Sequence, residues 1–394
     1  MPHKGGRYED RVFLPSFMLK RVLIIAGEAS GDLHGAGVVR ELKKRIPDLD
    51  IFGIGGDRMR REGMETVIHI SSMSFMGFAE VVRNLPFIRK VERMLESLLS
   101  TRPPDVVVLI DYPGFNLRFA RRVKRKGIAI LYYISPQVWA WHRSRVKKMK
   151  GIIDRMLVVF PFEVPFYEKE GIPVQFVGHP LVESIGLTLS RPKFCTRHNL
   201  RESKKILALL PGSRLQEIER ILPTMIKAAR ELQHKDDVQP VVGVSSNLGS
   251  EVMRRYIPED CGFPLVENGT YDLMASADAA IVTSGTATLE TGWFGTPMAV
   301  VYKTSPLTFL IGRMLVDVPH IGLVNIVAGK GIVPEFIQGD MTSENLVAAI
   351  RKILADVEYG AVMRKELAII KQKLEGPGAS SRVAEQVIAL GEAA

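Results

Sequence analysis

Short apolar runs alternate with helical patterns along most of the chain. In the first half the apolar runs are Val22–Ile25, Val106–Ile110, Ala129–Tyr133, Met156–Val159 and Val174–Val177, and in the second half they are Ile206–Leu210, Val238–Val244, Ala279–Val282 and Met298–Val301. These runs are apolar at consecutive rather than alternate positions, which is typical of parallel strands that helices cover on both faces. The pattern therefore predicts an α/β protein built on parallel sheets.

The alternation is interrupted once, by a polar stretch without strands from Ser184 to Lys205. A chain of 394 residues is too long for one ordinary core. We therefore expect two doubly wound, Rossmann-like domains, residues 18–185 and 186–375, with a cleft between them. Residues 376–394 begin with the break Gly376-Pro377-Gly378 and predict a helix that packs back on the first domain. Residues 1–17 are polar and aperiodic and predict a disordered extension, so Met1 and Met18 both stay open as the start of the chain.

Composition narrows the classes of protein. The two cysteines, Cys195 and Cys261, lie far apart without a metal-ligand pattern, which favours a reducing cytoplasm. The sequence contains no run of eighteen apolar residues, so it predicts no membrane span. A net charge of +10 indicates an anionic partner: nucleic acid, a phosphorylated substrate or an anionic membrane surface. The densest basic runs are 118–126, which includes Arg121 and Arg122, and 143–150. A solvated helix face is the alternative interpretation of these runs.

Titratable side chains follow the first strand and the strand Val106–Ile110. The turn from Ala26 to Gly35 carries Glu28, Ser30, Asp32 and His34, and its glycines allow close approach of a substrate. Asp111 comes directly after the second of these strands. A carboxylate at the edge of a cleft can take a proton from an attacking hydroxyl, so Asp111 is our candidate general base. Capping of the next helix is the alternative role for Asp111, and an ordinary capped turn is the alternative for the first segment.

Two glycine- and hydroxyl-rich turns in the second half predict seats for an anion. The first is Pro211-Gly212-Ser213-Arg214 and the second is Thr283-Ser284-Gly285-Thr286-Ala287-Thr288-Leu289-Glu290. Each joins a strand to a helix start, where backbone N–H groups bind phosphate, and Arg214 can bridge two phosphate oxygens. Two seats in one half suggest a pyrophosphate, with Glu290 suited to ribose hydroxyls. Two ordinary capped helix starts are the alternative.

No metal site is expected. The pair Asp48 and Asp50 has the spacing of a D-x-D motif but precedes an apparent strand, at the end away from the cleft. We expect helix dipoles, hydroxyls and Arg214 to stabilise a leaving phosphate without metal.

Residues 71–90 are rich in methionine and phenylalanine and predict a membrane-facing segment. Its apolar candidates for acyl chains or bilayer are Met76, Phe78, Val81, Val82 and Phe87. The adjoining basic runs would attract an anionic surface. Ordinary core is the competing interpretation of the segment.

Several motifs together resemble the lipid-A-disaccharide synthase family. They are Ala26–Asp32, Ser135–Trp141, Val177–Pro180, Leu210–Arg214, Ser284–Glu290, Tyr302–Thr308, Asn325–Gly329 and Ile332–Glu335, in the family's order. The turn after Asp111 departs from the family pattern, since Gly114 replaces a carboxylate that is common there.

The resemblance implies a GT-B fold and an inverting glycosyltransferase without a cofactor. Its substrates would be UDP-2,3-diacylglucosamine and 2,3-diacylglucosamine 1-phosphate (lipid X), and its products UDP and the β-1,6-linked lipid A disaccharide phosphate. It also implies peripheral attachment to the inner face of a Gram-negative inner membrane. In this interpretation Asp111, with Glu28 and Ser30 nearby, serves catalysis at the acceptor hydroxyl. Ser213, Arg214, Ser284, Gly285, Thr286, Thr288, Glu290 and Asn325 would hold UDP.

Other functions stay open at this stage. A UDP-N-acetylglucosamine 2-epimerase or a murein-precursor transferase would share the nucleotide site and differ in residues 71–90. A nucleic-acid binder is disfavoured because aromatic residues do not interleave with the basic runs. Association into a homodimer and the acyl-chain length are left open.

Overall fold

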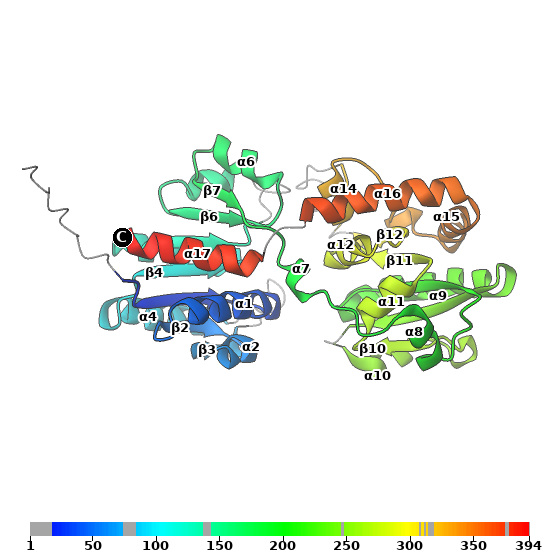
Figure 1. Ribbon diagram of the computed structural model, residues 1–394, viewed down its shortest axis with the longest axis horizontal. Coiled ribbons are helices and arrows are strands. Elements are labelled where there is room, and N and C mark those ends of the chain that lie inside the picture. The colour runs from blue at the N-terminus through cyan, green and yellow to red at the C-terminus, as the bar shows by residue number, and fades with distance from the viewer. Residues whose placement is uncertain are drawn as a thin grey trace, which may run out of the picture.

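The computed structural model describes residues 18–73, 84–136, 143–245, 248–306, 309–310, 313, 319–374 and 378–393. Two lobes lie side by side, each a parallel sheet with helices against it, and the chain passes between them through α7 (Leu181–Ser184) (Figure 1). The two parallel-sheet units predicted from the apolar runs are therefore confirmed.

The first lobe contains a seven-stranded parallel sheet in the order β3-β2-β1-β4-β5-β6-β7. Its strands are β1 (Arg21–Ala26), β2 (Asp50–Gly55), β3 (Glu65–His69), β4 (Val106–Ile110), β5 (Ala129–Tyr133), β6 (Arg155–Val158) and β7 (Val174–Phe176). Its helices are α1 (Ala29–Arg45), α2 (Asp57–Arg61), α4 (Leu85–Thr101), α5 (Pro113–Arg125) and α6 (Glu163–Lys169), with 3-10 turns η1 (Ile70–Ser72) and η2 (Arg143–Lys148). The strand order reverses between β1 and β4, and in such sheets a crevice opens at that point.

The second lobe contains a six-stranded parallel sheet in the order β10-β9-β8-β11-β12-β13, which reverses between β8 and β11. Its strands are β8 (Lys205–Leu210), β9 (Val238–Val244), β10 (Leu265–Glu267), β11 (Ala279–Thr283), β12 (Met298–Tyr302) and β13 (Glu335–Ile337). Its helices are α8 (Arg191–Arg197), α9 (Leu215–Lys235), α10 (Gly249–Arg254), α11 (Thr270–Ser276), α12 (Thr286–Trp293), α14 (Leu323–Ala328), α15 (Ser343–Ala355) and α16 (Val357–Leu374), with η3 (Glu259–Cys261) and η4 (Gln338–Asp340).

The core explains the continuous apolar runs. All five residues of β4 and all five of β11 are buried, because helices cover both faces of each sheet. Burying one such aliphatic side chain contributes about 1.5–3 kcal/mol. The shortest strands, β7, β10 and β13, have three residues each and are only partly buried.

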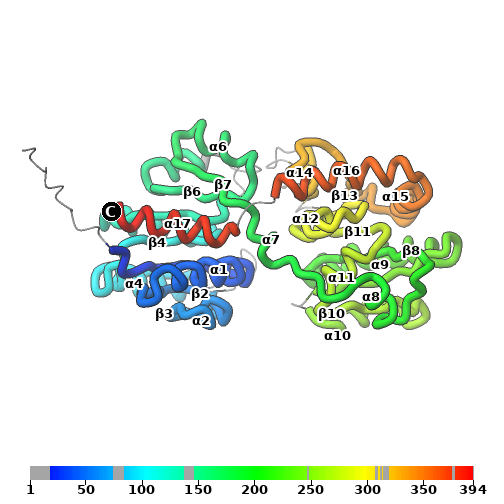
Figure 2. The backbone as a smooth tube through the Cα atoms, viewed as in Figure 1, coloured from blue at the N-terminus to red at the C-terminus, as the bar shows by residue number. Residues whose placement is uncertain are grey.

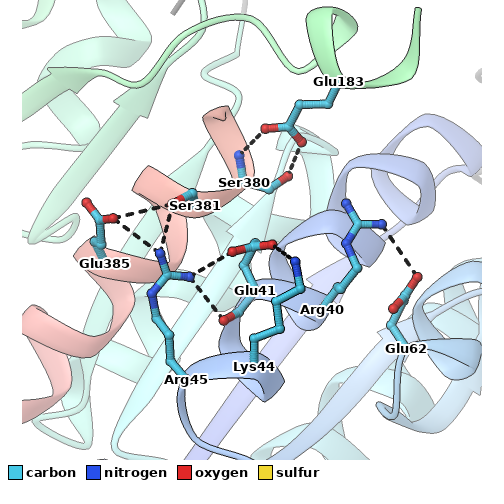
Figure 3. Close-up of polar contacts among 9 residues, drawn as sticks. All are labelled: Arg40, Glu41, Lys44, Arg45, Glu62, Glu183, Ser380, Ser381 and Glu385. Atoms are coloured by element: carbon cyan, nitrogen blue, oxygen red, sulfur yellow. Dashed lines mark hydrogen bonds and ion pairs between the residues drawn. The ribbon is translucent and has the colours of Figure 1, made fainter. Parts of the chain in front are cut away.

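The last helix, α17 (Ala379–Glu392), returns to the first lobe, whereas α16 lies on the second (Figure 2). It packs beside α1, where Gly37 is needed because a Cβ there would lie 2.3 Å from the Ser380 hydroxyl. Glu183 in α7 accepts hydrogen bonds from the backbone N–H and the hydroxyl of Ser380, at 2.7 and 2.5 Å (Figure 3). Arg45 in α1 donates to Ser381 at 2.8 Å. The predicted C-terminal helix is confirmed, while the residue boundaries 185/186 and 375/376 stay predictions.

Two further expectations fall outside the described residues. They are the disordered extension 1–17 and residues 74–83 of the membrane-facing segment. Within the described part of the chain, no helix is long and apolar enough to cross a membrane.

Candidate active site

Asp111 lies at the carboxyl end of β4, beside the end of β1 where the strand order reverses. Both Asp111 and Tyr112 have a positive φ, 45° and 47°, which is unfavourable for residues with a side chain. The Asp111 carbonyl oxygen accepts hydrogen bonds from the Tyr132 hydroxyl at 2.6 Å and the Asn116 side-chain amide at 2.7 Å. These bonds hold the strained turn that carries the carboxyl group.

Burial, and to a smaller extent the nearby charge of Glu28, raise the pKa of Asp111 to about 6. A hydrogen bond from the Tyr112 backbone opposes both. A carboxylate with a raised pKa is a stronger base, and it is still mostly ionised at neutral pH. The N-cap of α5 is Tyr112, so Asp111 is not the cap of that helix.

The turn between β1 and α1 lies against this group. Gly27 is required because the ring of Tyr112 occupies the place of a Cβ, 2.3 Å away. Glu28 is the exposed N-cap of α1, and Ser30 is exposed on its first turn. Glu28, Ser30 and Asp111 are thus carried by adjoining turns at one edge of the sheet.

Asp32 has a structural role in the same turn. It is 4% exposed, and its carboxylate accepts hydrogen bonds from the backbone N–H groups of Gly56, Arg58 and Met59 at 2.7, 3.2 and 3.1 Å. It therefore caps α2 rather than the helix on which it lies. His34 lies two residues further along α1, and burial lowers its pKa to about 4.

A cavity of about 600 Å³ lies at the carboxyl ends of β8, β9, β10 and β11 in the second lobe. Six residues predicted from the sequence to bind UDP line this cavity: Ser213, Arg214, Ser284, Gly285, Thr286 and Glu290. Gly186 and Thr188, which follow the linker helix α7, also line it, so the cavity borders the linker between the lobes. The volume suits a nucleotide, because ligand cavities are commonly 300–1,000 Å³.

The first predicted anion seat is the turn before α9. Gly212 has a φ of 109°, and a Cβ there would lie 2.4 Å from a carboxylate oxygen of Glu217. Glu217 accepts hydrogen bonds from the Ser213 backbone at 3.2 Å and from the Arg214 guanidinium at 2.9 Å. The Arg214 side chain is 70% exposed, so it is held at the cavity with its other donors accessible. These contacts of Glu217 with the turn were not predicted.

The second predicted seat is the start of α12. Gly285 is its N-cap, with a φ of 152° and open space where a Cβ would lie. The first N–H groups of α12 thus lie beside the cavity, an arrangement that favours an anion. The Ser284 hydroxyl donates to the Ile321 carbonyl at 2.7 Å. Thr288 is fully buried outside the lining, and its hydroxyl donates to the Gly285 carbonyl at 2.8 Å.

Glu290 and Tyr271 form a pair in the same cavity. Burial raises the pKa of Glu290, and the Tyr271 hydroxyl donates a hydrogen bond to it at 3.3 Å, which opposes the rise. Burial raises the pKa of Tyr271 to about 12, so this hydroxyl keeps its proton. Tyr271 was not predicted, although Asn268-Gly269-Thr270-Tyr271 follows β10 at a strand's carboxyl end. The short strand gave too weak an apolar signal.

The structure does not bring Asn325 to the cavity lining. It is fully buried on α14, where its amide oxygen accepts from the N–H groups of Ile332 and Val333 at 2.8 and 3.0 Å. Its amide nitrogen donates to Val333 and to Glu335 at 2.9 and 2.8 Å. These four bonds use its hydrogen-bonding groups to hold the segment before β13.

Most of the predicted acyl or membrane contacts, Met76, Phe78, Val81 and Val82, lie outside the described residues. Phe87 is half-buried on α4, against the first-lobe core. Arg121 is exposed on α5. Arg122 forms ion pairs with Glu92 and Glu96 of α4, so its charge is balanced within the protein.

The D-x-D pair lies at the amino end of its strand, as predicted. Asp50 begins β2 and binds the Arg102 guanidinium at 2.5 and 3.0 Å. Among the described residues, no three His, Cys, Asp or Glu side chains gather in a group that could hold a metal ion.

Sequence comparison gives a family for residues 22–387, which match the model described as lipid-A-disaccharide synthetase. The chain is 44% identical to a lipid-A-disaccharide synthase of Trichlorobacter lovleyi over 95% of its length and 98% of the relative's. It is 46% identical to one of Syntrophus aciditrophicus over 94% of this chain and 98% of that one.

Solved structures with the same fold are more distant in sequence. CalG4, the calicheamicin glycosyltransferase, superposes with a TM-score of 0.62 at 17% identity, covering 94% of this chain and 98% of its own. A UDP-GlcNAc 2-epimerase from Neisseria meningitidis superposes with a TM-score of 0.64 at 14% identity, covering 94% and 99%. These similarities show the GT-B fold, and at such identities they show the fold alone.

Proposed function

The chain belongs to the lipid-A-disaccharide synthetase family, and from that membership and its site we propose the following reaction. It is a glycosyltransferase that joins UDP-2,3-diacylglucosamine to 2,3-diacylglucosamine 1-phosphate (lipid X). The products are UDP and the β-1,6-linked lipid A disaccharide 1-phosphate. The configuration at the donor C1 is inverted, because the acceptor oxygen attacks from the side opposite to the leaving UDP.

One observation supports the proposal that the two lobes have different roles in the reaction. A carboxyl group with a raised pKa lies at the strand-order reversal of the first sheet, and a nucleotide-sized cavity lies at that of the second. A base on one lobe and a seat for the leaving group on the other are what a one-step displacement requires.

Asp111 is the base in this proposal. Its carboxylate takes the proton of the acceptor 6-hydroxyl while that oxygen forms the new bond to the donor C1. Burial is the main cause of the raised pKa of Asp111 and Glu28 adds to it, and Ser30 is a nearby hydroxyl for orienting the acceptor.

The leaving UDP is held in the cavity of the second lobe. Arg214 and the helix starts at Ser213 and at Gly285–Thr286 stabilise the pyrophosphate charge as the C1–O bond breaks. Glu290 with Tyr271 is placed for the ribose hydroxyls. In this arrangement the leaving group needs no metal ion.

The acceptor is a lipid, and we propose that the enzyme meets it as a peripheral protein on the inner face of the inner membrane. Exposed Arg89, Lys90 and Arg93 on α4 adjoin Phe87 and the exposed Met94. Basic groups beside apolar ones favour an anionic lipid surface. Residues 71–90 would complete this surface, and a homodimer remains a separate proposal.

The test uses the purified protein with both substrates in detergent micelles, analysed by mass spectrometry. We expect the disaccharide 1-phosphate and UDP only when both substrates are present. Asp111→Asn should lower kcat by about two to four powers of ten and leave UDP affinity within a few fold. The proposal would be contradicted if the donor glucosamine were epimerised at C2 and no disaccharide formed. Near-normal turnover by the variant would also contradict it.

A further inference from the structure

A second cavity lies where the first lobe, the linker and the returning helix meet. It has a volume of about 250 Å³, and we call it the hinge cavity. Its lining residues are Leu33, His34, Ala36, Gly37, Arg40, Arg58, Arg61, Glu62, Pro180, Glu183, Ser184 and Ser380. Figure 3 shows part of its wall, with Glu183 and Ser380 on one side and Arg40 and Glu62 on the other. It shares no lining residue with the 600 Å³ cavity of the second lobe, which we call the nucleotide cavity.

Three arginines from two helices reach this cavity. Arg40 is on α1, and Arg58 and Arg61 are on α2. Arg40 lies 3.7 Å from the Glu62 carboxylate, which is too long for a hydrogen bond. Within the described part of the chain, the guanidinium groups of Arg58 and Arg61 have no hydrogen-bond or ion-pair partner.

The other polar groups of the wall are largely used within the protein. Glu183 is committed to the start of α17 through its two bonds to Ser380. The Ser184 hydroxyl donates to the Leu181 carbonyl at 2.9 Å. His34 is neutral at physiological pH because burial lowers its pKa. Glu183 keeps its negative charge, because its partners are neutral, and Arg40 and Glu62 form a long ion pair. The charged side chains of the wall therefore carry a net charge of +1, and Arg58 and Arg61 supply the guanidinium groups that have no partner among the described residues.

This arrangement favours a phosphate group over a simpler anion. A phosphomonoester carries a charge between −1.5 and −2 near pH 7, so it gains more from the two unpartnered guanidinium groups than a singly charged anion does. Arginine binds phosphate through paired, charge-assisted hydrogen bonds. The cavity would hold about eight water molecules, so it has room for more than the phosphate alone.

The position also relates the cavity to the candidate base. His34 is six residues after Glu28 on α1, about 9 Å along the helix axis. Glu28 in turn borders Asp111. In a hexopyranose the anomeric oxygen is on C1 and the C6 hydroxymethyl group is on C5, the two carbons that flank the ring oxygen, so a phosphate on the anomeric oxygen lies within one sugar unit of the reacting hydroxyl.

We propose that the hinge cavity binds a phosphomonoester and that it takes the 1-phosphate of the acceptor sugar. The second part rests on the proposed function. Binding there would place the acceptor by its phosphate, while its 6-hydroxyl reaches Asp111. Arg58 and Arg61 are then specificity residues for an acceptor that carries a phosphate.

The first experiment measures binding without turnover. Full-length protein is saturated with UDP, so that the nucleotide cavity is filled, and titrated calorimetrically with inorganic phosphate, glucosamine 1-phosphate or glucosamine. We expect saturable binding of glucosamine 1-phosphate, weaker binding of phosphate and none of glucosamine. The double variant Arg58→Gln/Arg61→Gln should bind the sugar phosphate about 100-fold more weakly, about tenfold for each charge-assisted pair.

Arg60→Gln is the matched control. Arg60 lies on the same helix, pairs with Asp57 at 2.7 Å and does not line the cavity. Its replacement should leave binding unchanged. If Arg60→Gln weakened binding equally, the effect would be one of general surface charge and the proposal would be overturned. Absence of saturable binding by the unmodified protein would also overturn it. Phosphate binding as tightly as the sugar phosphate would indicate a site for the free ion and overturn the acceptor assignment.

The second experiment measures the Michaelis constants of both substrates. In the double variant we expect KM for the acceptor to rise 10- to 100-fold, while KM for the UDP-sugar stays within about twofold. An unchanged acceptor KM would overturn the acceptor assignment. If the unmodified protein forms no disaccharide at all, the proposed function fails, and the binding experiment still decides whether the cavity takes a phosphomonoester.

Discussion

Replacing Asp111 with asparagine should remove a pH-dependent cost in stability as well as the candidate base. The pKa of this carboxyl group is about 6 in the folded protein, against 3.8 for an aspartate side chain in water. At a pH between these two pKa values the folded state therefore binds more protons than the unfolded state. The free energy of unfolding falls as the pH rises through this range. Above about pH 7 the full cost is present. It amounts to about 3 kcal/mol, since one pKa unit is worth about 1.4 kcal/mol.

The magnitude at each pH follows from the same two pKa values. Asp111 should destabilise the folded state by about 1 kcal/mol at pH 4.5 and by about 3 kcal/mol at pH 7.5. Asparagine does not titrate and keeps an oxygen that can accept the Tyr112 backbone hydrogen bond. The difference in unfolding free energy between Asp111→Asn and the unmodified protein should therefore shift by about 2 kcal/mol in favour of the variant over this pH range.

Urea denaturation followed by circular dichroism at pH 4.5, 6.0 and 7.5 measures this difference. Only its change with pH is diagnostic, because a constant offset reflects packing and hydrogen bonding of the amide. Glu28→Gln is the second arm, and it should reduce the pH-dependent part only slightly, since burial is the larger cause of the raised pKa. The claim that Asp111 is a buried carboxyl group with a raised pKa would be refuted if this difference were independent of pH. It would also be refuted if the difference shifted against the variant as the pH rises.

Other perturbations test separate parts of the structure. Asp32→Ala should lower the unfolding free energy by about 2–3 kcal/mol, measured by the same denaturation, because the start of α2 loses three buried hydrogen bonds; a change under 0.5 kcal/mol would argue against the cap. Arg214→Gln should lower kcat/KM for the UDP-sugar about 10- to 100-fold, and unaltered kinetics would remove Arg214 from the pyrophosphate seat. Activity should survive exhaustive treatment with EDTA; loss that magnesium or manganese restores would contradict metal-free stabilisation of the leaving group. Replacing Met76, Phe78 and Phe87 with Gln should leave vesicle binding that high salt removes, whereas the unmodified protein stays partly bound; a collapse in Tm would show that these side chains belong to the core.

The central part of each sheet was predictable from the sequence because its strands are apolar on both faces. The runs Val106–Ile110 and Ala279–Val282 correspond to β4 and β11, the buried strands beside each strand-order reversal. The strands β3, β10 and β13 were not predicted. They are only partly buried, and they lack an apolar run like Val174–Val177, which marks the short strand β7.

The candidate site was predictable to the extent that strand ends carry it. Ser213 and Ser284 line one cavity because they follow neighbouring strands of one sheet. The same reasoning did not show the direction of a side chain. Thr288 lies in a motif that lines the cavity yet points to the turn's own carbonyl, and Asn325 holds the backbone before β13.

Glu217 and the arginines of the hinge cavity were missed for a different reason. Their positions depend on contacts between helices and turns that no local pattern encodes. Arg58 and Arg61 lie in a short helix whose apolar periodicity is too brief to reveal which way it faces.

The pH dependence of kcat/KM for disaccharide formation tests the central claim most directly, because it reads the ionisation of the base in the working enzyme. With both substrates in micelles, the rate should rise tenfold per pH unit below an apparent pKa near 6 and level off above it. In Asp111→Asn the residual rate should lack this limb. A limb that persists unchanged in the variant, or a profile of the unmodified enzyme that is flat from pH 5 to 8, would contradict Asp111 as the group that takes the acceptor proton.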